Sequence, residues 1–133
     1  MRYSATVREH FARPRNAGRF AASVSPVASG DAGRVETGAR VAIDLHVETA
    51  TVAAVRWRVY GCPHLLAATS IVSERLCGAA VADLGELRLA GMAEELELPT
   101  EKLGLLLVLE DAVHAAAAAA TGLRESARNI TTG

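Results

Sequence analysis

The sequence has few cysteines and no excess of charge of either sign. Its 133 residues include only two cysteines, Cys62 and Cys77, which are too far apart to form a CxxC pair. A small secreted protein stapled by disulfides needs a denser and more even set of cysteines, so we expect a reducing cytoplasm. The net charge of -1 provides no global field that would recruit nucleic acid or an anionic membrane.

Targeting signals and long apolar runs are also missing. Charges occur within the first nine residues, and no apolar segment of a signal peptide follows them. No run approaches the roughly 18 apolar residues that a membrane-spanning helix requires. We therefore expect a soluble, unprocessed protein without membrane contacts. Because the sequence also lacks a Ser-His-Asp set, a phosphate-binding loop and paired carboxylates, we do not expect an enzyme.

The patterns that are present indicate one α+β domain. Apolar residues at every fourth position predict an N-terminal helix from Tyr3 to Phe11, capped by Ser4. Alternating apolar residues predict two strands, 41–47 and 52–60, which form an antiparallel hairpin. The Gly-, Ala- and Ser-rich segment before them is expected to be an irregular loop with one short strand near Val24 to Ser29.

Two further helices are predicted to cover one face of this small sheet. One begins at Pro63 and ends just before Gly78, and a longer one is capped by Thr100 and ends at Gly122. The order of helix, strands and helices is typical of an α+β fold with an antiparallel sheet. We assign residues 1–122 to one domain and predict that residues 123–133 form a flexible C-terminal tail.

Cys62 stands at the junction between a predicted strand and a predicted helix, in the sequence VYGCPHLLAAT. Because Pro63 is favoured at the first position of a helix, the sulfur should lie near free backbone N-H groups. Two interpretations remain open, a reactive thiol and a small residue that fills the turn. His64 could supply half of a zinc site in a symmetric dimer, although a solvent-facing histidine is the simpler interpretation. Cys77 is expected to be a packing residue.

Several segments together resemble the IscU/NifU-type iron-sulfur cluster assembly scaffold family. They are YS near the start, HFARPRNAGRF, VASGDAG, VYGC, AEELELP with Lys102, and EDA. The resemblance extends from Tyr3 to about Ala120 without evident gaps. It implies the same α+β fold and a role in building iron-sulfur clusters, with a cysteine desulfurase and an Hsp70-type chaperone as partners.

The resemblance also implies a site that has lost most of its ligands. The family holds its nascent [2Fe-2S] cluster or a zinc ion on three cysteines, helped by an aspartate and a histidine, and soft thiolates suit both. Cys62 matches the middle cysteine. The substituted positions are Thr37 and Leu105 for the other two cysteines, Ala39 for the aspartate and Gly104 for the histidine. We therefore expect no stably bound cofactor and no metal held by the protein alone, but transient iron or a [2Fe-2S] cluster shared with a partner.

The segment ELPTEK resembles the family's chaperone-recognition loop. Leu98, Pro99 and Lys102 are retained, whereas Thr100 and Glu101 replace a proline and a valine. A proline turn followed by a helix cap explains these residues equally well.

Two hypotheses about function follow. In the first, Cys62 acts as a sulfur acceptor, or as a partial iron or cluster ligand that a partner completes. In the second, the protein is a non-enzymatic interaction module that binds the assembly machinery and modulates it. Replacement of Cys62 separates them, because only the first requires the thiol. Both place Thr37, Ala39, Cys62 and Leu105 together near one end of the sheet.

Overall fold

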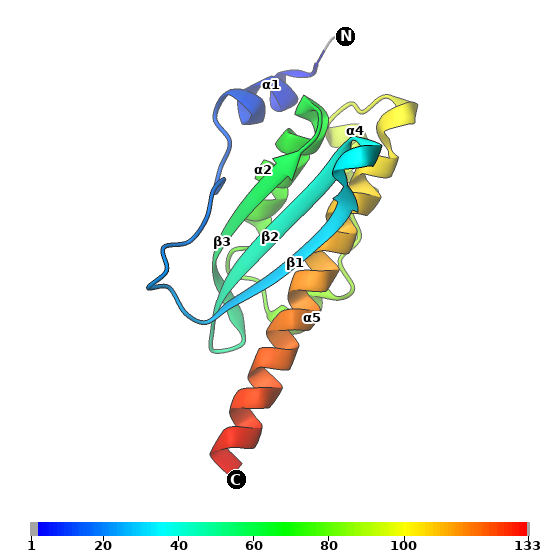
Figure 1. The fold of residues 1–133 in the computed structure, drawn as a ribbon. Coiled ribbons are helices and arrows are strands. Elements are labelled where there is room, and N and C mark those ends of the chain that lie inside the picture. Colours follow the sequence, from blue (N-terminus) through cyan, green and yellow to red (C-terminus); the bar gives the residue numbers. More distant parts are fainter. Residues whose placement is uncertain (1–2, 133) are drawn as a thin grey trace.

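A computed structural model describes residues 3–132 and the side chains of residues 3–123. It shows the expected α+β architecture, a three-stranded antiparallel sheet with helices packed against it (Figure 1). The elements in chain order are α1 (Ala5–Ala12), β1 (Val27–Arg34), the 3-10 helix η1 (Val35–Thr37), β2 (Ala39–Glu48), β3 (Thr51–Tyr60), α2 (Pro63–Leu76), α3 (Val81–Leu84), α4 (Met92–Glu95), the 3-10 helix η2 (Thr100–Lys102) and α5 (Gly104–Thr132).

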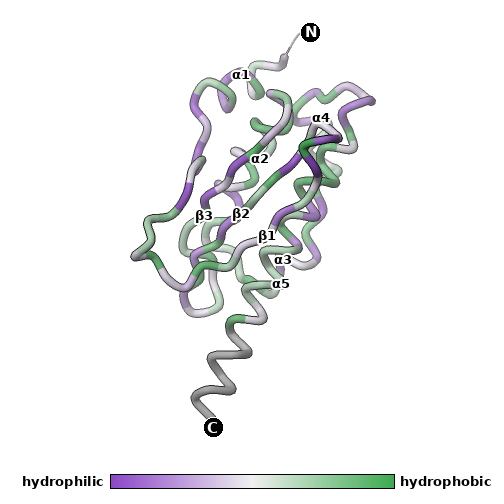
Figure 2. Tube along the Cα trace, in the orientation of Figure 1, coloured by the Kyte–Doolittle hydropathy of each residue, from purple (hydrophilic) through white to green (hydrophobic). Residues whose placement is uncertain are grey.

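The predicted antiparallel hairpin is confirmed as β2 and β3. Ile43 pairs with Trp57 and Val41 with Val59, and the alternate residues of β2 from Val41 to Val47 are buried. Figure 2 shows the hydropathy of the residues along the sheet and the helices. The short strand expected near Val24 to Ser29 exists as β1, but it begins at Val27 and continues to Arg34, so the irregular loop expected after Ser29 is wrong, and the strand pairs with β2 along its whole length. Its inward residues are small, so the strand lacks the apolar alternation on which the prediction depended.

Small residues let β1 and α5 pack very closely. A Cβ atom added to Gly30 would lie 2.1 Å from the backbone nitrogen of Ala116, so only glycine fits at this point of the strand. The facing side of α5 includes Ala112, Ala116 and Ala120, all buried. The alanine run therefore has a packing role: it brings the helix axis close to the sheet.

The boundaries predicted for the long helix are wrong at both ends. Pro99, and not Thr100, precedes the first turn, which is the 3-10 helix η2, and α5 itself begins at Gly104. The helix then passes through Gly122 and continues to Thr132, since one glycine costs a helix only about 1 kcal/mol. The backbone of the predicted tail, 123–133, is thus helical as far as Thr132, and Gly133 lies outside the described residues.

The segment Thr100–Leu123 is long and apolar enough to cross a membrane by length and composition, so the expectation that no such run exists is wrong. The core helix of a soluble protein meets the same criterion. Leu106, Leu109, Val113 and Ala116 are buried within the domain, which is the arrangement of a core helix.

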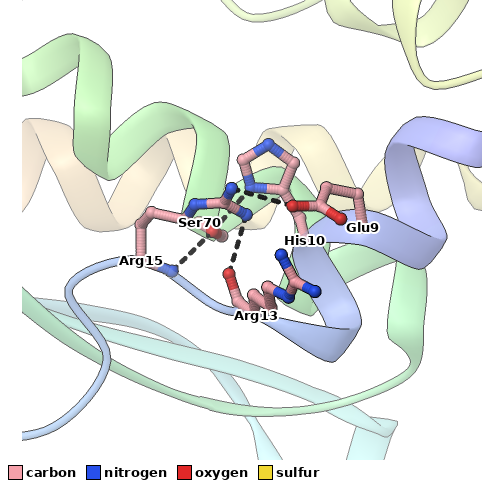
Figure 3. Close-up of polar contacts among 5 residues, drawn as sticks. All are labelled: Glu9, His10, Arg13, Arg15 and Ser70. Atoms are coloured by element: carbon pink, nitrogen blue, oxygen red, sulfur yellow. Dashed lines mark hydrogen bonds and ion pairs between the residues drawn. The ribbon is translucent and has the colours of Figure 1, made fainter.

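Polar contacts attach the N-terminal arm, residues 3–19, to α2 and β3. Ser4 caps α1 as predicted and accepts a hydrogen bond from the backbone of Val7, the one buried residue of this helix. Ser70 of α2 accepts from the backbone N-H of Arg15 at 2.9 Å, and its Oγ lies 2.8 Å from Nδ1 of His10 (Figure 3). The indole N-H of Trp57 donates to the carbonyl of Arg15 at 2.6 Å.

Candidate functional site

One end of the sheet brings together the start of β2, the end of β3 and the start of α2. Arg40 and Tyr60 form the final pair of the β2-β3 ladder, and Gly38 and Cys62 each lie two residues beyond it along the chain. A Cβ atom added to Gly61 would lie 3.6 Å from the carbonyl oxygen of Gly38. The turn that carries Thr37 and Ala39 therefore lies beside the turn that carries Cys62.

The first turns of α5 pack at the same end. A Cβ atom on Gly33 would lie 2.1 Å from the carbonyl oxygen of Ala39 and 2.9 Å from Cγ1 of Val108. Val108 of α5 thus lies close to the start of β2. Leu105, one helical turn before Val108, is half-buried and packs against the core.

Cys62 is the N-cap residue of α2, as the sequence predicted. Its backbone is extended, Pro63 occupies the first helical position, and its carbonyl accepts the N-H of Leu66 at 3.1 Å. The side chain makes no capping hydrogen bond and is partly exposed. The Cys62 sulfur therefore does not cap the free N-H groups at the start of α2.

The substituted positions provide no replacement ligands. The Thr37 hydroxyl donates to the carbonyl of Arg34 at 2.9 Å, Ala39 is buried, Gly104 has no side chain and Leu105 is apolar. Among the residues that the structure describes, no group of three His, Cys, Asp or Glu side chains could hold a metal ion. An iron-sulfur cluster takes four ligands, so the residues present do not fit one without a partner.

His64 is not the solvent-facing residue that the sequence suggested. Its side chain is only 2% exposed and the ring of Tyr3 covers it edge-on, with 4.8 Å between the ring centroids. Nδ1 is buried and has no hydrogen-bond partner. Burial lowers the pKa of His64, and the positive charge of Lys102 lowers it further. Sequence reasoning missed this environment because Tyr3 and Lys102 approach His64 only in the folded chain.

Cys77 differs from its prediction as well. It was expected to be a packing residue, yet it is exposed at the C-terminal end of α2, where its thiol lies 3.4 Å from the carbonyl of Ser73. The 14 residues of α2 separate the two cysteines by about 20 Å. The protein therefore carries two free thiols in unlike surroundings, and only that of Cys62 lies at the substituted site.

The predicted chaperone-recognition loop adopts a compact turn. Leu98 is half-buried and its N-H donates to the carbonyl of Ala93 at 2.9 Å. Pro99 precedes η2, and Lys102 is the last residue of that turn. This arrangement is a proline turn followed by a short 3-10 helix, which is the alternative to a chaperone-recognition loop.

Exposed apolar side chains lie close in sequence to the substituted positions. The structure has six large exposed hydrophobic residues among those described, and four of them lie within two positions of a ligand position. These four, which we call the apolar rim, are Val35, Tyr60, Leu103 and Leu107. Val35 and Tyr60 line one hollow and Leu103 and Leu107 line another, and exposed apolar side chains of this kind occur on surfaces that contact other proteins.

Comparison with known proteins agrees with the fold and extends the resemblance. Residues 2–126 match the family model described as the NifU-like N terminal domain. The chain is 32% identical over 127 residues to the iron-sulfur cluster assembly scaffold protein IscU of Escherichia coli, covering 95% of this chain and 99% of that protein. It is 33% identical over 117 residues to the IscU protein of Buchnera aphidicola, covering 87% and 91% respectively.

The fold is similar to that of a solved relative. The N-terminal part of a NifU-like protein from Brucella abortus superposes with a TM-score of 0.62, covering 84% of this chain and 88% of that one. At 17% sequence identity, this likeness concerns the fold alone.

Proposed function

This chain belongs to the NifU-like N-terminal domain family, which includes the IscU iron-sulfur cluster assembly scaffolds, and we propose that it serves cluster assembly through a single thiol. This thiol is that of Cys62, and it accepts sulfur from a cysteine desulfurase. The observation that carries this proposal is the state of that thiol. Cys62 is partly exposed and makes no capping hydrogen bond, and the four neighbouring ligand positions of the family carry residues that bind neither metal nor sulfide.

Sulfur acceptance needs only one thiolate, whereas cluster binding needs four ligands. The Cys62 thiolate attacks the outer sulfur of a persulfide on the desulfurase. A new S-S bond forms between Sγ of Cys62 and that sulfur, and the S-S bond of the donor breaks. The bonding electron pair leaves on the donor's cysteine sulfur, and the transferred sulfur keeps its proton. No external oxidant or reductant is required.

In this proposal the protein is not an enzyme but an acceptor and carrier. Cys62 could not hold a [2Fe-2S] cluster or an iron ion alone, so any cluster is cargo, bound transiently and shared with a partner that supplies the other ligands. The reaction requires a reduced thiol, which is consistent with a cytoplasmic location. The resemblance of Leu98, Pro99 and Lys102 to the family's chaperone-recognition loop supports an Hsp70-type chaperone as a further partner, although the segment forms a compact turn in which Leu98 is half-buried.

The test is persulfidation by a cysteine desulfurase from the same organism, supplied with cysteine. Intact-mass spectrometry and peptide mapping should find the added sulfur on Cys62 of the wild type and of Cys77→Ser, and none on Cys62→Ser. Equal labelling of both cysteines, or labelling that survives the loss of Cys62, would contradict the proposal.

The apolar rim favours a second candidate function, a non-enzymatic interaction module. Val35, Tyr60, Leu103 and Leu107 would contact the assembly machinery, and the protein would modulate assembly by occupying that surface. This candidate predicts that Cys62→Ser retains the effect of the protein on cluster assembly in a reconstituted system. It also predicts that Leu107→Lys abolishes this effect, because a charged side chain would be placed in the contact.

A further inference from the structure

The face of the sheet away from the helices carries a hollow lined by three arginines. In Figure 1, α2 and α5 lie behind the sheet, and the described residues place no helix on its front face. This face carries the residues of β2 and β3 that alternate with the apolar core residues. The hollow has a volume of about 280 Å³, and its lining includes Arg19, Arg40 and Arg58 together with Tyr60 and Val35.

The register of the sheet explains this hollow. Ala42 lies opposite Arg58 in the β2-β3 ladder and opposite Asp31 in the β1-β2 ladder. Arg40, two residues before Ala42 on the same face, lies opposite Tyr60. The Cβ atoms of directly opposite residues are about 5 Å apart, so one methyl group is surrounded by long side chains. The small residue leaves the space that the guanidinium groups surround.

Two of the three guanidinium groups are held in place by aspartates. Asp44 accepts a hydrogen bond from Nη1 of Arg58 at 2.8 Å, and the same nitrogen donates to the carbonyl of Gly18 at 3.2 Å. Asp31 pairs with Nη2 of Arg40. A guanidinium has five N-H donors, so each arginine keeps donors on its other nitrogens. The ion pairs therefore position both cations without using all of their hydrogen bonds.

Arg19 supplies a positive charge that is not compensated. Its side chain is exposed, and no carboxylate among the residues that the structure describes lies within ion-pair distance of it. Three arginines against two aspartates leave one positive charge in excess at the hollow. This excess favours an anionic group from outside the protein.

The lining of the hollow fits a protein partner better than a small molecule or a nucleic acid. Tyr60 is 56% exposed and Val35 is 46% exposed, and tyrosine and arginine are enriched where proteins contact one another. Ligand pockets bury most of the surface of a small molecule, whereas this hollow lies on an open sheet face. A nucleic acid backbone would meet the carboxylates of Asp31 and Asp44, which lie beside the arginines and repel phosphate.

We propose that this hollow docks an acidic segment of a partner protein, in which a carboxylate lies next to an apolar side chain. The carboxylate accepts hydrogen bonds from the three guanidinium groups, since two N-H groups of one guanidinium match the two oxygens of a carboxylate. The apolar side chain packs on Tyr60 and Val35. This inference goes beyond the proposed role of Cys62, because it requires no thiol.

The experiment titrates peptides into the isotope-labelled full-length protein and follows the backbone NMR signals. The probes are a panel of short peptides that carry several carboxylates and one leucine or tyrosine at varied spacing. The same peptides with amides in place of carboxylates, inorganic phosphate and a single-stranded oligonucleotide are the comparison ligands. We expect acidic peptides of the panel to shift the signals of Arg40, Ala42 and Arg58, and the amide peptides to leave them unchanged.

Two charge-matched variants test the site. Arg19→Gln and Arg8→Gln each remove one exposed positive charge, but Arg8 lies on α1 and does not line the hollow. Neither side chain has an ion-pair partner among the described residues, so both variants should fold. Arg19→Gln should raise the Kd of the tightest peptide at least several-fold, and Arg8→Gln should not change it. Ala42→Leu fills the hollow without altering any charge and should also weaken binding.

A Kd that is equal in Arg19→Gln and Arg8→Gln would overturn the docking surface, as would the failure of every acidic peptide to bind. Wild-type affinity in a folded Ala42→Leu would place the peptide elsewhere and overturn it too. Phosphate or the oligonucleotide binding in the hollow more tightly than the peptides would overturn the protein partner. None of these outcomes concerns the sulfur acceptor, which the persulfidation of Cys62→Ser decides separately.

Discussion

At the scale of single residues, the main features of this protein are buried polar side chains. Their surroundings cannot be predicted from the neighbouring sequence. His64 is buried beneath Tyr3, which lies 61 positions earlier in the chain. Asp44, on the sheet face away from the helices, is buried and accepts hydrogen bonds from Ser29 at 2.7 Å and Arg58 at 2.8 Å. Both residues are polar groups within the fold, so both should influence its stability.

The histidines should make the protein less stable in mild acid. Burial lowers the pKa of His10 and His64 below the ordinary value of 6.5, and the positive charges of Arg15 and Lys102 add to the effect. The unfolded chain therefore binds protons more readily at these two positions. Their contribution to stability is complete above a pH of about 6.5 and is lost as the pH falls below that value.

Urea unfolding at about pH 8, 6.5 and 5 should show this loss as a falling free energy of unfolding. The double variant His10→Gln, His64→Leu should show a smaller decrease over the same range. An identical pH dependence in the two proteins would mean that other groups cause it.

The ion pair of Asp44 and Arg58 should contribute more than that of Asp31 and Arg40. Burial tends to raise the pKa of Asp44, but hydrogen bonds from Arg58 and Ser29 and the charge of Arg58 outweigh it and hold the pKa below its ordinary value. Asp44→Asn should lower the free energy of unfolding at neutral pH by about 1–3 kcal/mol, because it disrupts charge-assisted hydrogen bonds to a buried carboxylate.

Asp31→Asn is the matched control. Asp31 and Arg40 are both about half exposed, so the loss of their ion pair should change the free energy of unfolding by less than about 1 kcal/mol. Chemical denaturation measures both changes. Equal losses in the two variants would show that burial does not distinguish these pairs.

At the scale of elements, the close contact between β1 and α5 requires a residue without a side chain at position 30, which is Gly30. Alanine at this position would place its Cβ 2.1 Å from the backbone of Ala116, which cannot move without displacing the helix. Gly30→Ala should therefore lower the free energy of unfolding by about 1–3 kcal/mol or more.

Gly85→Ala provides the comparison for this glycine. Gly85 has helical backbone angles and no atom near the position of the new Cβ, so alanine should leave stability unchanged or raise it by a few tenths of a kcal/mol. Chemical denaturation under one set of conditions measures both variants. A Gly30→Ala protein as stable as Gly85→Ala would contradict the close approach of strand and helix.

The sequence predicted those elements whose periodicity is strong. The β2-β3 hairpin, the N-terminal helix capped by Ser4 and the start of α2 at Pro63 each follow from local pattern or capping chemistry. It predicted β1 only as a short strand near Val24 to Ser29, because small residues that pack on alanines have no apolar alternation. It misplaced the ends of α5, where a favourable helical context overrides Gly122. The surroundings of His64 and Cys77 depend on tertiary contacts and on exposure, which periodicity does not report.

At the scale of the whole molecule, we propose that a retained scaffold fold surrounds a site that has lost most of its ligands. The chain matches the NifU-like N terminal domain from residue 2 to residue 126. In the register that the resemblance implies, the first, third and accessory ligand positions carry Thr37, Leu105, Ala39 and Gly104. We infer that the fold preserves the surface at the end of the sheet, while the chemistry is reduced to one thiol. Restoring the ligands should therefore restore cluster binding.

The most direct test is whether the protein alone retains an iron-sulfur cluster after anaerobic reconstitution with iron and sulfide. The reconstituted protein is desalted in the presence of a chelator, and absorption spectroscopy and iron analysis then measure what remains bound. The wild type is compared with a variant that carries Thr37→Cys, Ala39→Asp, Gly104→His and Leu105→Cys. We predict that the wild type loses its iron and its visible absorption, because one thiolate holds a cluster weakly, and that the variant keeps both. A wild-type protein that retains a cluster as firmly as the variant would contradict the central claim that this site cannot hold one alone.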